Sequence, residues 1–72
     1  MVAETTDFPG SSNLASASYD PDVENLTITF RSGDTYVYFN VPSAAYRGLQ
    51  NAGSAGEYFS RQIRNRYGYE RA

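Results

Sequence analysis

Two segments near the middle of the chain decide the fold: LTITF at residues 26–30 and TYVYFNV at residues 35–41. The first alternates apolar residues with threonine, which is the pattern of a strand with one buried face. The second is rich in aromatic and β-branched residues, which are enriched in strands. Because only RSGD at residues 31–34 separates them, the sequence predicts an antiparallel hairpin at the centre of the fold.

The register of this hairpin decides which way Tyr36 and Tyr38 face. A two-residue loop at Ser32 and Gly33 would place both tyrosines opposite threonines, on the solvent face of the sheet. A three-residue loop, with Gly33 in the left-handed bulge position, would place them opposite Ile28 and Leu26 in the core. A slip of one residue exchanges the two faces, so only one register can hold. We favour the bulge, because glycine stands third in the loop.

Further elements follow on both sides of the hairpin. LASASY at residues 14–19 is a weaker strand, and Asp20-Pro21-Asp22 predicts the turn that joins it to the hairpin. Residues 1–11 are polar and without periodicity, so we expect a flexible tail that precedes a single domain at residues 12–72.

Two helices are predicted after Pro42, which ends the sheet. The first is capped by Ser43, runs to about residue 52 and ends at Gly53 as a left-handed C-terminal residue. The second begins with the capping box of Ser54 and Glu57 and ends at Gly68. The predicted fold is α+β, a three-stranded antiparallel meander followed by two C-terminal helices.

The composition argues against catalysis. The 72 residues include no Cys, His, Trp or Lys. The common general bases, thiol nucleophiles, Schiff-base amines and zinc ligands are therefore missing. No apolar run is long enough to span a membrane, and the first ten residues do not resemble a signal peptide. We expect a small cytoplasmic, monomeric, non-enzymatic binding protein that needs no cofactor.

Charge is divided unevenly along the chain, although the net charge is only -2. Residues 1–40 hold six acidic residues and one arginine, whereas residues 41–72 hold five arginines and two acidic residues. In the C-terminal segment SRQIRNRYGYER at residues 60–71, arginine alternates with tyrosine and amide side chains, as in surfaces that bind single-stranded nucleic acid. The candidate nucleic-acid-binding residues are Arg61, Arg64, Arg66, Arg71, Tyr67, Tyr36 and Tyr38.

Two other motifs are explained without a ligand. Asp20, Asp22 and Glu24 alternate like the start of a calcium loop, but the glycine and the glutamate that such a loop needs further on are absent, so no metal site is predicted. The small residues 53–56 precede a helix and could receive an anion. Glu57 in the first turn would repel that anion, so we interpret this motif as a helix cap.

The order of motifs resembles that of the lysyl-tRNA synthetase C-terminal (KTSC) domain family. The motifs are SNL at 12–14, YDP at 19–21, LxIxFxSG at 26–33, YVYFNVP at 36–42, Tyr46, AxSxGxYF at 52–59 and IRxxY at 63–67. The motifs end at residue 67, and the resemblance as a whole runs from about residue 12 to residue 71. Ala55 departs from the pattern, since relatives tend to carry lysine there.

The resemblance implies a domain that occurs at the end of some lysyl-tRNA synthetases and as small free-standing proteins of bacterial or phage type. This chain resembles the free-standing kind. The family context suggests RNA as a partner, and the leading hypothesis is weak RNA binding by the C-terminal Arg/Tyr surface. The alternative is a protein-protein interaction module, a small phage or bacterial accessory factor that docks on another protein.

Overall fold

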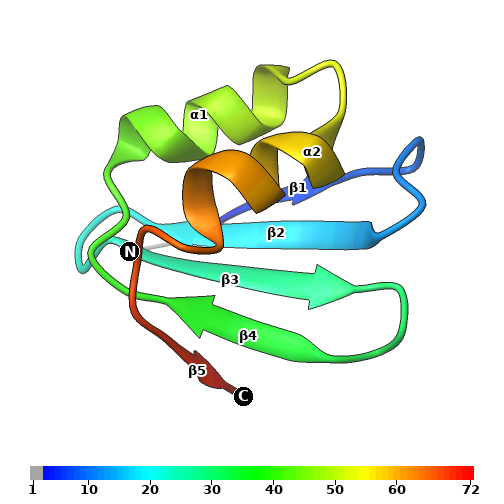
Figure 1. The fold of residues 1–72 in the computed structure, drawn as a ribbon. Coiled ribbons are helices and arrows are strands. Elements are labelled where there is room, and N and C mark those ends of the chain that lie inside the picture. The colour runs from blue at the N-terminus through cyan, green and yellow to red at the C-terminus, as the bar shows by residue number, and fades with distance from the viewer. Residues whose placement is uncertain (1–2) are drawn as a thin grey trace.

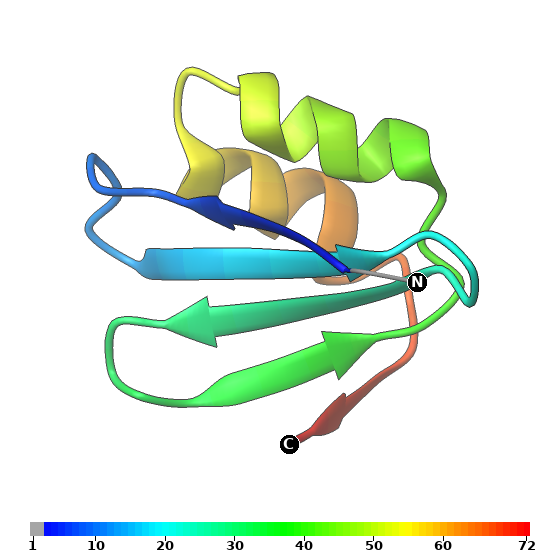
Figure 2. The same ribbon diagram turned by 180° about the vertical axis from the view of Figure 1, so that it is seen from behind.

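The computed structural model describes residues 3–72, which form an antiparallel sheet with the helical segments on one of its faces (Figure 1, Figure 2). The strands are β1 Glu4–Asp7, β2 Leu14–Asp20, β3 Asn25–Phe30, β4 Thr35–Tyr38 and β5 Tyr69–Arg71, and they lie in the order β1-β2-β3-β4-β5. The helical segments are α1 Ser43–Asn51, α2 Ala55–Tyr58 and the π-helical turn η1 Phe59–Ile63. The α+β class is confirmed. The expected three-stranded meander is wrong, because β1 and β5 make the sheet five-stranded.

The central hairpin has the bulged register. Ile28 pairs with Tyr36 and Leu26 pairs with Tyr38, so both tyrosines lie on the same face of the sheet as the buried aliphatic side chains. Gly33 has φ 99°, a left-handed conformation that costs glycine little. The Phe30 amide donates to Asp34 O at 2.9 Å and closes the loop. The prediction that the tyrosine rings face the core is therefore confirmed.

Strand β1 corrects the expectation that residues 1–11 are an unstructured tail, at least for residues 4–7. It pairs with β2, with Thr6 opposite Ala17. Phe8 follows the strand and is buried, and its amide donates to Ala15 O at 3.0 Å. A short polar edge strand buries little apolar area, so its sequence does not alternate between apolar and polar residues. The apolar side chain of Phe8 is the one signal in this segment that could have indicated packing against the core.

Strand β5 corrects the expectation that the second helix continues to Gly68. The helix ends with η1 at Ile63, and the chain then returns along the outer edge of β4 (Figure 1). The Phe39 amide donates to Gly68 O at 2.9 Å, and the Ala72 amide donates to Thr35 O at 2.8 Å. Three paired residues are too few for an alternating pattern to be recognisable in the sequence.

The helical segments begin and end in part as predicted. The Ser54 hydroxyl accepts from the Glu57 amide at 3.3 Å, which confirms its capping role. Pro42 rather than Ser43 is the N-cap of α1, and Ser43 is its first helical residue. Gly53 is not left-handed; α1 ends at Asn51, and its C-cap residue Ala52 has an extended backbone.

The core lies between the helical segments and the sheet. Tyr19 and Tyr46 stack there with ring centroids 4.9 Å apart, and the Tyr19 hydroxyl donates to Val41 O at 2.6 Å. This bond ties β2 to the start of the helical half of the chain. Among residues 3–72, no helix has the length and apolar character to span a bilayer.

Candidate nucleic-acid interface

The predicted site residues are distributed over the β4–β5 edge of the sheet and the end of the helical half. Tyr36 and Tyr38 lie on β4 and face the helices, with Tyr38 only 3% exposed and Tyr36 half-buried. Tyr67 is half-buried and packs against the core. Arg61, Arg64 and Arg66 are exposed, as is Arg71 on β5. The tyrosines of the prediction are thus mainly structural, and the arginines are accessible.

Five aromatic side chains form a closed cycle of contacts at this edge of the sheet. Tyr69 on β5 contacts Tyr36 and Tyr38, with ring centroids 5.6 and 5.3 Å away. Phe59 on η1 contacts Tyr38 and Phe30, each at 5.5 Å. Phe30 and Tyr36 close the cycle at 5.7 Å. Three of the five contacts are edge-to-face, a geometry that aromatic rings favour, and the two contacts of Tyr69 are tilted.

A cavity of about 510 Å³ lies beside this cycle. We call it the β4–β5 cleft. The residues that line it include Ser32, Asp34, Tyr36, Tyr38, Arg64, Asn65 and Tyr69. Its volume is in the range of small-molecule sites in proteins. Tyr69 is 55% exposed, so its ring is the aromatic surface most accessible to a ligand.

The cleft brings together only some of the predicted residues. Arg64, Tyr36 and Tyr38 line it, whereas Arg61, Arg66 and Tyr67 do not. Arg71 lies next to it on β5, where its Nη2 contacts Asp34 Oδ1 at 2.6 Å. Its charge is thus paired within the chain, in an ion pair whose two side chains are both accessible to solvent.

Several polar side chains of the cleft were not among the predicted site residues. Asn65 was visible in the arginine-rich segment, but Ser32 and Asp34 were interpreted only as the turn of the hairpin. Ser32 and Asp34 line the cleft together with Tyr69 because β5 pairs with β4 and adds a strand to the sheet beside the hairpin. No local signal could have indicated this, since the strands are distant in the chain.

The surroundings of Tyr38 have an electrostatic consequence. Burial raises the pKa of the Tyr38 hydroxyl above its ordinary value, and the neighbouring Tyr69 and Tyr36 raise this pKa further, while the Arg64 guanidinium lowers it. Tyr38 therefore stays neutral at physiological pH.

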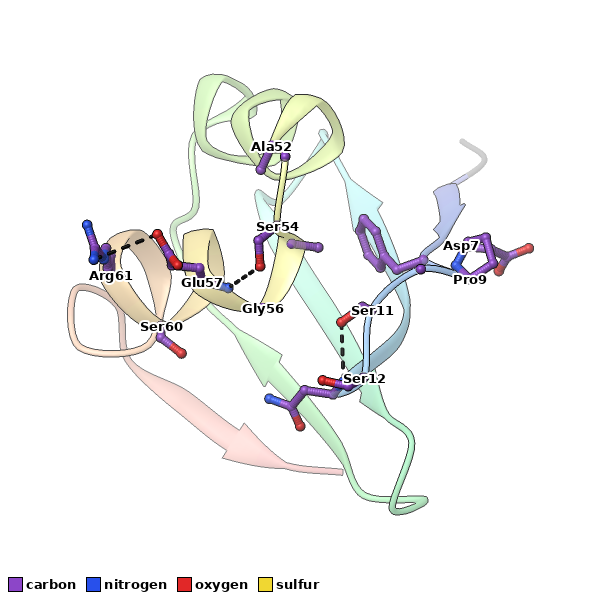
Figure 3. A pocket seen from close by; sticks show the side chains of 15 residues that line it. Asp7, Pro9, Ser11, Ser12, Ala52, Ser54, Gly56, Glu57, Ser60 and Arg61 are labelled. Carbon is purple, nitrogen blue, oxygen red and sulfur yellow. Dashed lines mark hydrogen bonds and ion pairs between the residues drawn. The ribbon is translucent and has the colours of Figure 1, made fainter.

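A second cavity, of about 780 Å³, lies between the β1–β2 connection and the start of α2 (Figure 3). Several of its polar side chains have partners within the chain. Ser11 Oγ accepts from the Leu14 amide at 3.0 Å, and Ser54 Oγ caps α2. Arg61 lies at the rim and pairs with Glu57, one turn earlier in the helical segment, at 3.7 Å. These groups hold the loop and the helix in place.

The acidic turn between β2 and β3 has a structural role as well. Asp20 Oδ1 accepts from the Asp22 amide at 3.0 Å, the hydrogen bond of an ordinary aspartate turn. Glu24 ends the turn with φ 57°, and its carbonyl accepts from the Val41 amide at 2.9 Å. The turn thereby supports the junction between β4 and α1.

Comparison with known proteins places the chain among domains of this architecture. The crystal structure of a KTSC domain protein from Yersinia pestis superposes with a TM-score of 0.91 at 31% identity, covering 99% of both chains. A lysine–tRNA ligase of Nostoc sp. is 39% identical over 62 residues, which are 86% of this chain and 11% of the ligase. A protein of Stutzerimonas stutzeri is 40% identical over 50 residues, covering 69% of this chain and 70% of that protein.

The chain therefore spans only a small part of the ligase that it matches. The family model that matches it, over residues 10–67, is that of the KTSC domain. Together with the fold and the shared motifs, this match shows that the chain belongs to the KTSC domain family.

Proposed function

We propose that this KTSC domain is a non-enzymatic domain that binds single-stranded RNA at the β4–β5 cleft. The observation that carries the proposal is the combination of an exposed Tyr69 ring with the Arg64 guanidinium and the Asn65 amide around one cavity. Aromatic rings stack on unpaired bases, guanidinium groups contact phosphates, and amides bond to base edges. The cleft offers all three kinds of contact.

The family context supports RNA as the polymer. The relatives include lysine–tRNA ligases, enzymes whose name specifies a tRNA substrate. In this chain the contacts are few, so the affinity should lie in the range of non-specific binding, with a Kd of roughly 10⁻⁴ to 10⁻⁶ M. Arg64 provides the phosphate contact in the cleft, and Arg66, in the same turn after η1, extends the positive surface.

The distribution of exposed hydrophobic side chains favours RNA over a protein partner. Among residues 3–72, the large hydrophobic side chains exposed most are Val23 and Tyr69, which lie in different elements. Tyr69 lines the same cleft as Arg64. A protein-docking surface would be expected to show an apolar patch away from the arginines.

Fluorescence anisotropy with a labelled single-stranded hexanucleotide RNA tests the proposal. Wild-type protein should bind with micromolar affinity at low salt. Arg64→Gln should weaken binding and reduce the slope of log K against log salt by about 0.7, the contribution of one phosphate contact on a single strand. Tyr69→Ala should lose stacking worth about 1–3 kcal/mol.

Arg47→Gln is the matched control, because Arg47 is an exposed arginine on α1 that does not line the cleft. It removes the same charge and should leave the affinity nearly unchanged. Absence of binding at low salt would exclude the RNA function. Equal losses in Arg64→Gln and Arg47→Gln would show that binding depends on overall charge and not on the cleft.

A further inference from the structure

The β4–β5 cleft has two chemically different ends. At one end, in the connection between β3 and β4, lie Asp34 and Ser32. At the other end lie Arg64 and Asn65, in the segment that leads from η1 to Gly68, whose carbonyl accepts from the amide of Phe39, the residue after Tyr38. The four residue steps from Asp34 to Tyr38 correspond to about 13 Å of extended strand. A ligand in the cleft therefore meets a carboxylate at one end and a guanidinium at the other.

This polarity fixes the orientation of a nucleotide. Arg71 already pairs with the Asp34 carboxylate and neutralises that end, whereas Arg64 forms no ion pair within residues 3–72 and attracts a phosphate. The phosphate therefore lies at the Arg64 end and the base lies toward Asp34, with its ring against Tyr69 or Tyr36. An ionised carboxylate accepts hydrogen bonds and donates none, so it binds a base edge that carries N–H donors.

The four RNA bases differ in the donors that they present. Guanine carries two adjacent donors on its Watson–Crick edge, N1–H and the N2 amino group. Adenine and cytosine place an acceptor beside their amino group, and uracil has one N–H between two carbonyl groups. A carboxylate can accept two parallel hydrogen bonds from guanine alone among these bases.

Asp34 retains the capacity for these bonds. Its Oδ1 accepts from Arg71 at 2.6 Å, and its Oδ2 accepts from the Ser32 hydroxyl at 3.3 Å. A carboxylate has about four acceptor positions, so about two remain. The Asp34 side chain is 42% exposed, and Asp34 lines the cleft, so a base can reach it.

We propose that the β4–β5 cleft selects a guanosine nucleotide in single-stranded RNA, with Asp34 accepting from guanine N1 and N2 and Arg64 contacting its phosphate. This inference rests on the proposed RNA-binding function and adds base selectivity to it. The Arg71 ion pair holds the carboxylate at the mouth of the cleft. Arg71 is thus a positioning residue for Asp34.

Three hexauridine RNA probes with one substituted position test the inference, the substitution being guanosine, inosine or adenosine. Inosine keeps N1–H and lacks the N2 amino group. The guanosine probe should bind about tenfold or more tightly than the adenosine probe, as expected for one bidentate pair. The inosine probe should fall between them. This comparison needs only the wild-type protein, so no variant has to fold.

Two variants then separate the carboxylate from its ion pair. Asp34→Asn replaces an acceptor-only group by an amide and also removes the Arg71 ion pair, and it should abolish the guanosine preference. Arg71→Gln removes the same ion pair and keeps the carboxylate, so it should reduce the preference for guanosine over adenosine without abolishing it. A preference that is unchanged in Arg71→Gln would overturn the positioning role of Arg71.

Each outcome of the experiment decides between the proposals. Binding of all three probes with equal affinity would overturn base selection and leave the RNA-binding proposal intact. Absence of binding to every probe at low salt would overturn both. A guanosine preference that survives in Asp34→Asn would overturn the role of Asp34.

Discussion

At the scale of single residues, Gly48 is the position where the packing of the helices tolerates least change. A Cβ built on Gly48 would lie 2.5 Å from Tyr58 Cζ and closer still to the Tyr58 hydroxyl. Tyr58 is half-buried and packs against the core, so its ring has little room to move. The absence of a side chain at residue 48 thus lets α1 approach α2.

Gly48→Ala should therefore destabilise the protein, even though alanine favours helix more than glycine. We expect a loss of about 1–3 kcal/mol, the usual cost of overpacking. The matched control is Gly56→Ala in α2, where a Cβ would be 3.8 Å or more from its neighbours. That variant should be neutral or up to about 1 kcal/mol more stable. Guanidinium unfolding followed by circular dichroism measures both, and equal stabilities would contradict the packing argument.

At the scale of elements, β5 links the stability of the sheet edge to the cleft. It pairs with β4 through Tyr36–Arg71, Val37–Glu70 and Tyr38–Tyr69. All three of its residues are exposed, in contrast to the buried positions of β2 and β3. A short exposed edge strand of this kind opens more readily than the centre of a sheet.

Deletion of residues 69–72 should lower the free energy of unfolding by about 2–4 kcal/mol, through loss of several backbone hydrogen bonds worth about 1 kcal/mol each. Arg71→Gln, the matched single change, should cost at most about 1 kcal/mol, because its ion pair is exposed. Native-state hydrogen exchange should also show faster exchange for β5 than for β3. Equal protection of the two strands would show that β5 is not the weak edge.

The strands also show which parts of the fold can be predicted from sequence patterns. LTITF and TYVYFNV predict the central hairpin, because half-buried strands repeat their polarity every two residues. The same logic fails for β1 and β5, which lie at the edges and bury too little to show alternation. Arg64 and Tyr36 were identified one by one, yet their meeting in one cleft depends on the pairing of β5 with β4. Pairing between distant segments leaves no trace in local sequence.

At the scale of the whole molecule, stability depends on how the seven tyrosines are distributed. Three of them, Tyr19, Tyr38 and Tyr46, are nearly inaccessible. A chain without cysteine or tryptophan thus uses phenol rings to fill its core. Each ring carries an ionisable hydroxyl, and this composition makes folding sensitive to alkaline pH.

The hydroxyls of Tyr19 and Tyr38 determine whether stability rises or falls at alkaline pH. Burial raises the pKa of Tyr19 above its ordinary value of 10.0, and the carboxylates of Glu24, Asp20 and Glu4 raise this pKa further. Burial likewise raises the pKa of Tyr38. In the unfolded chain both groups ionise near pH 10. The folded state therefore holds their protons more tightly, and its stability falls as pH rises through and beyond that value.

We expect the free energy of unfolding, measured with urea, to decrease steadily above about pH 10. Below about pH 9 the Tyr19 and Tyr38 hydroxyls should not change it, because both are protonated in the folded and in the unfolded chain. Tyr38→Phe should make this decrease shallower, because it removes one of the ionising groups. Tyr19→Phe should do the same and should also lose about 1–3 kcal/mol at neutral pH, since Val41 O loses its buried donor. An alkaline decrease of unchanged steepness in both variants would show that other groups cause it. Wild-type stability that persists unchanged to about pH 11 would show that neither hydroxyl is held neutral by the fold.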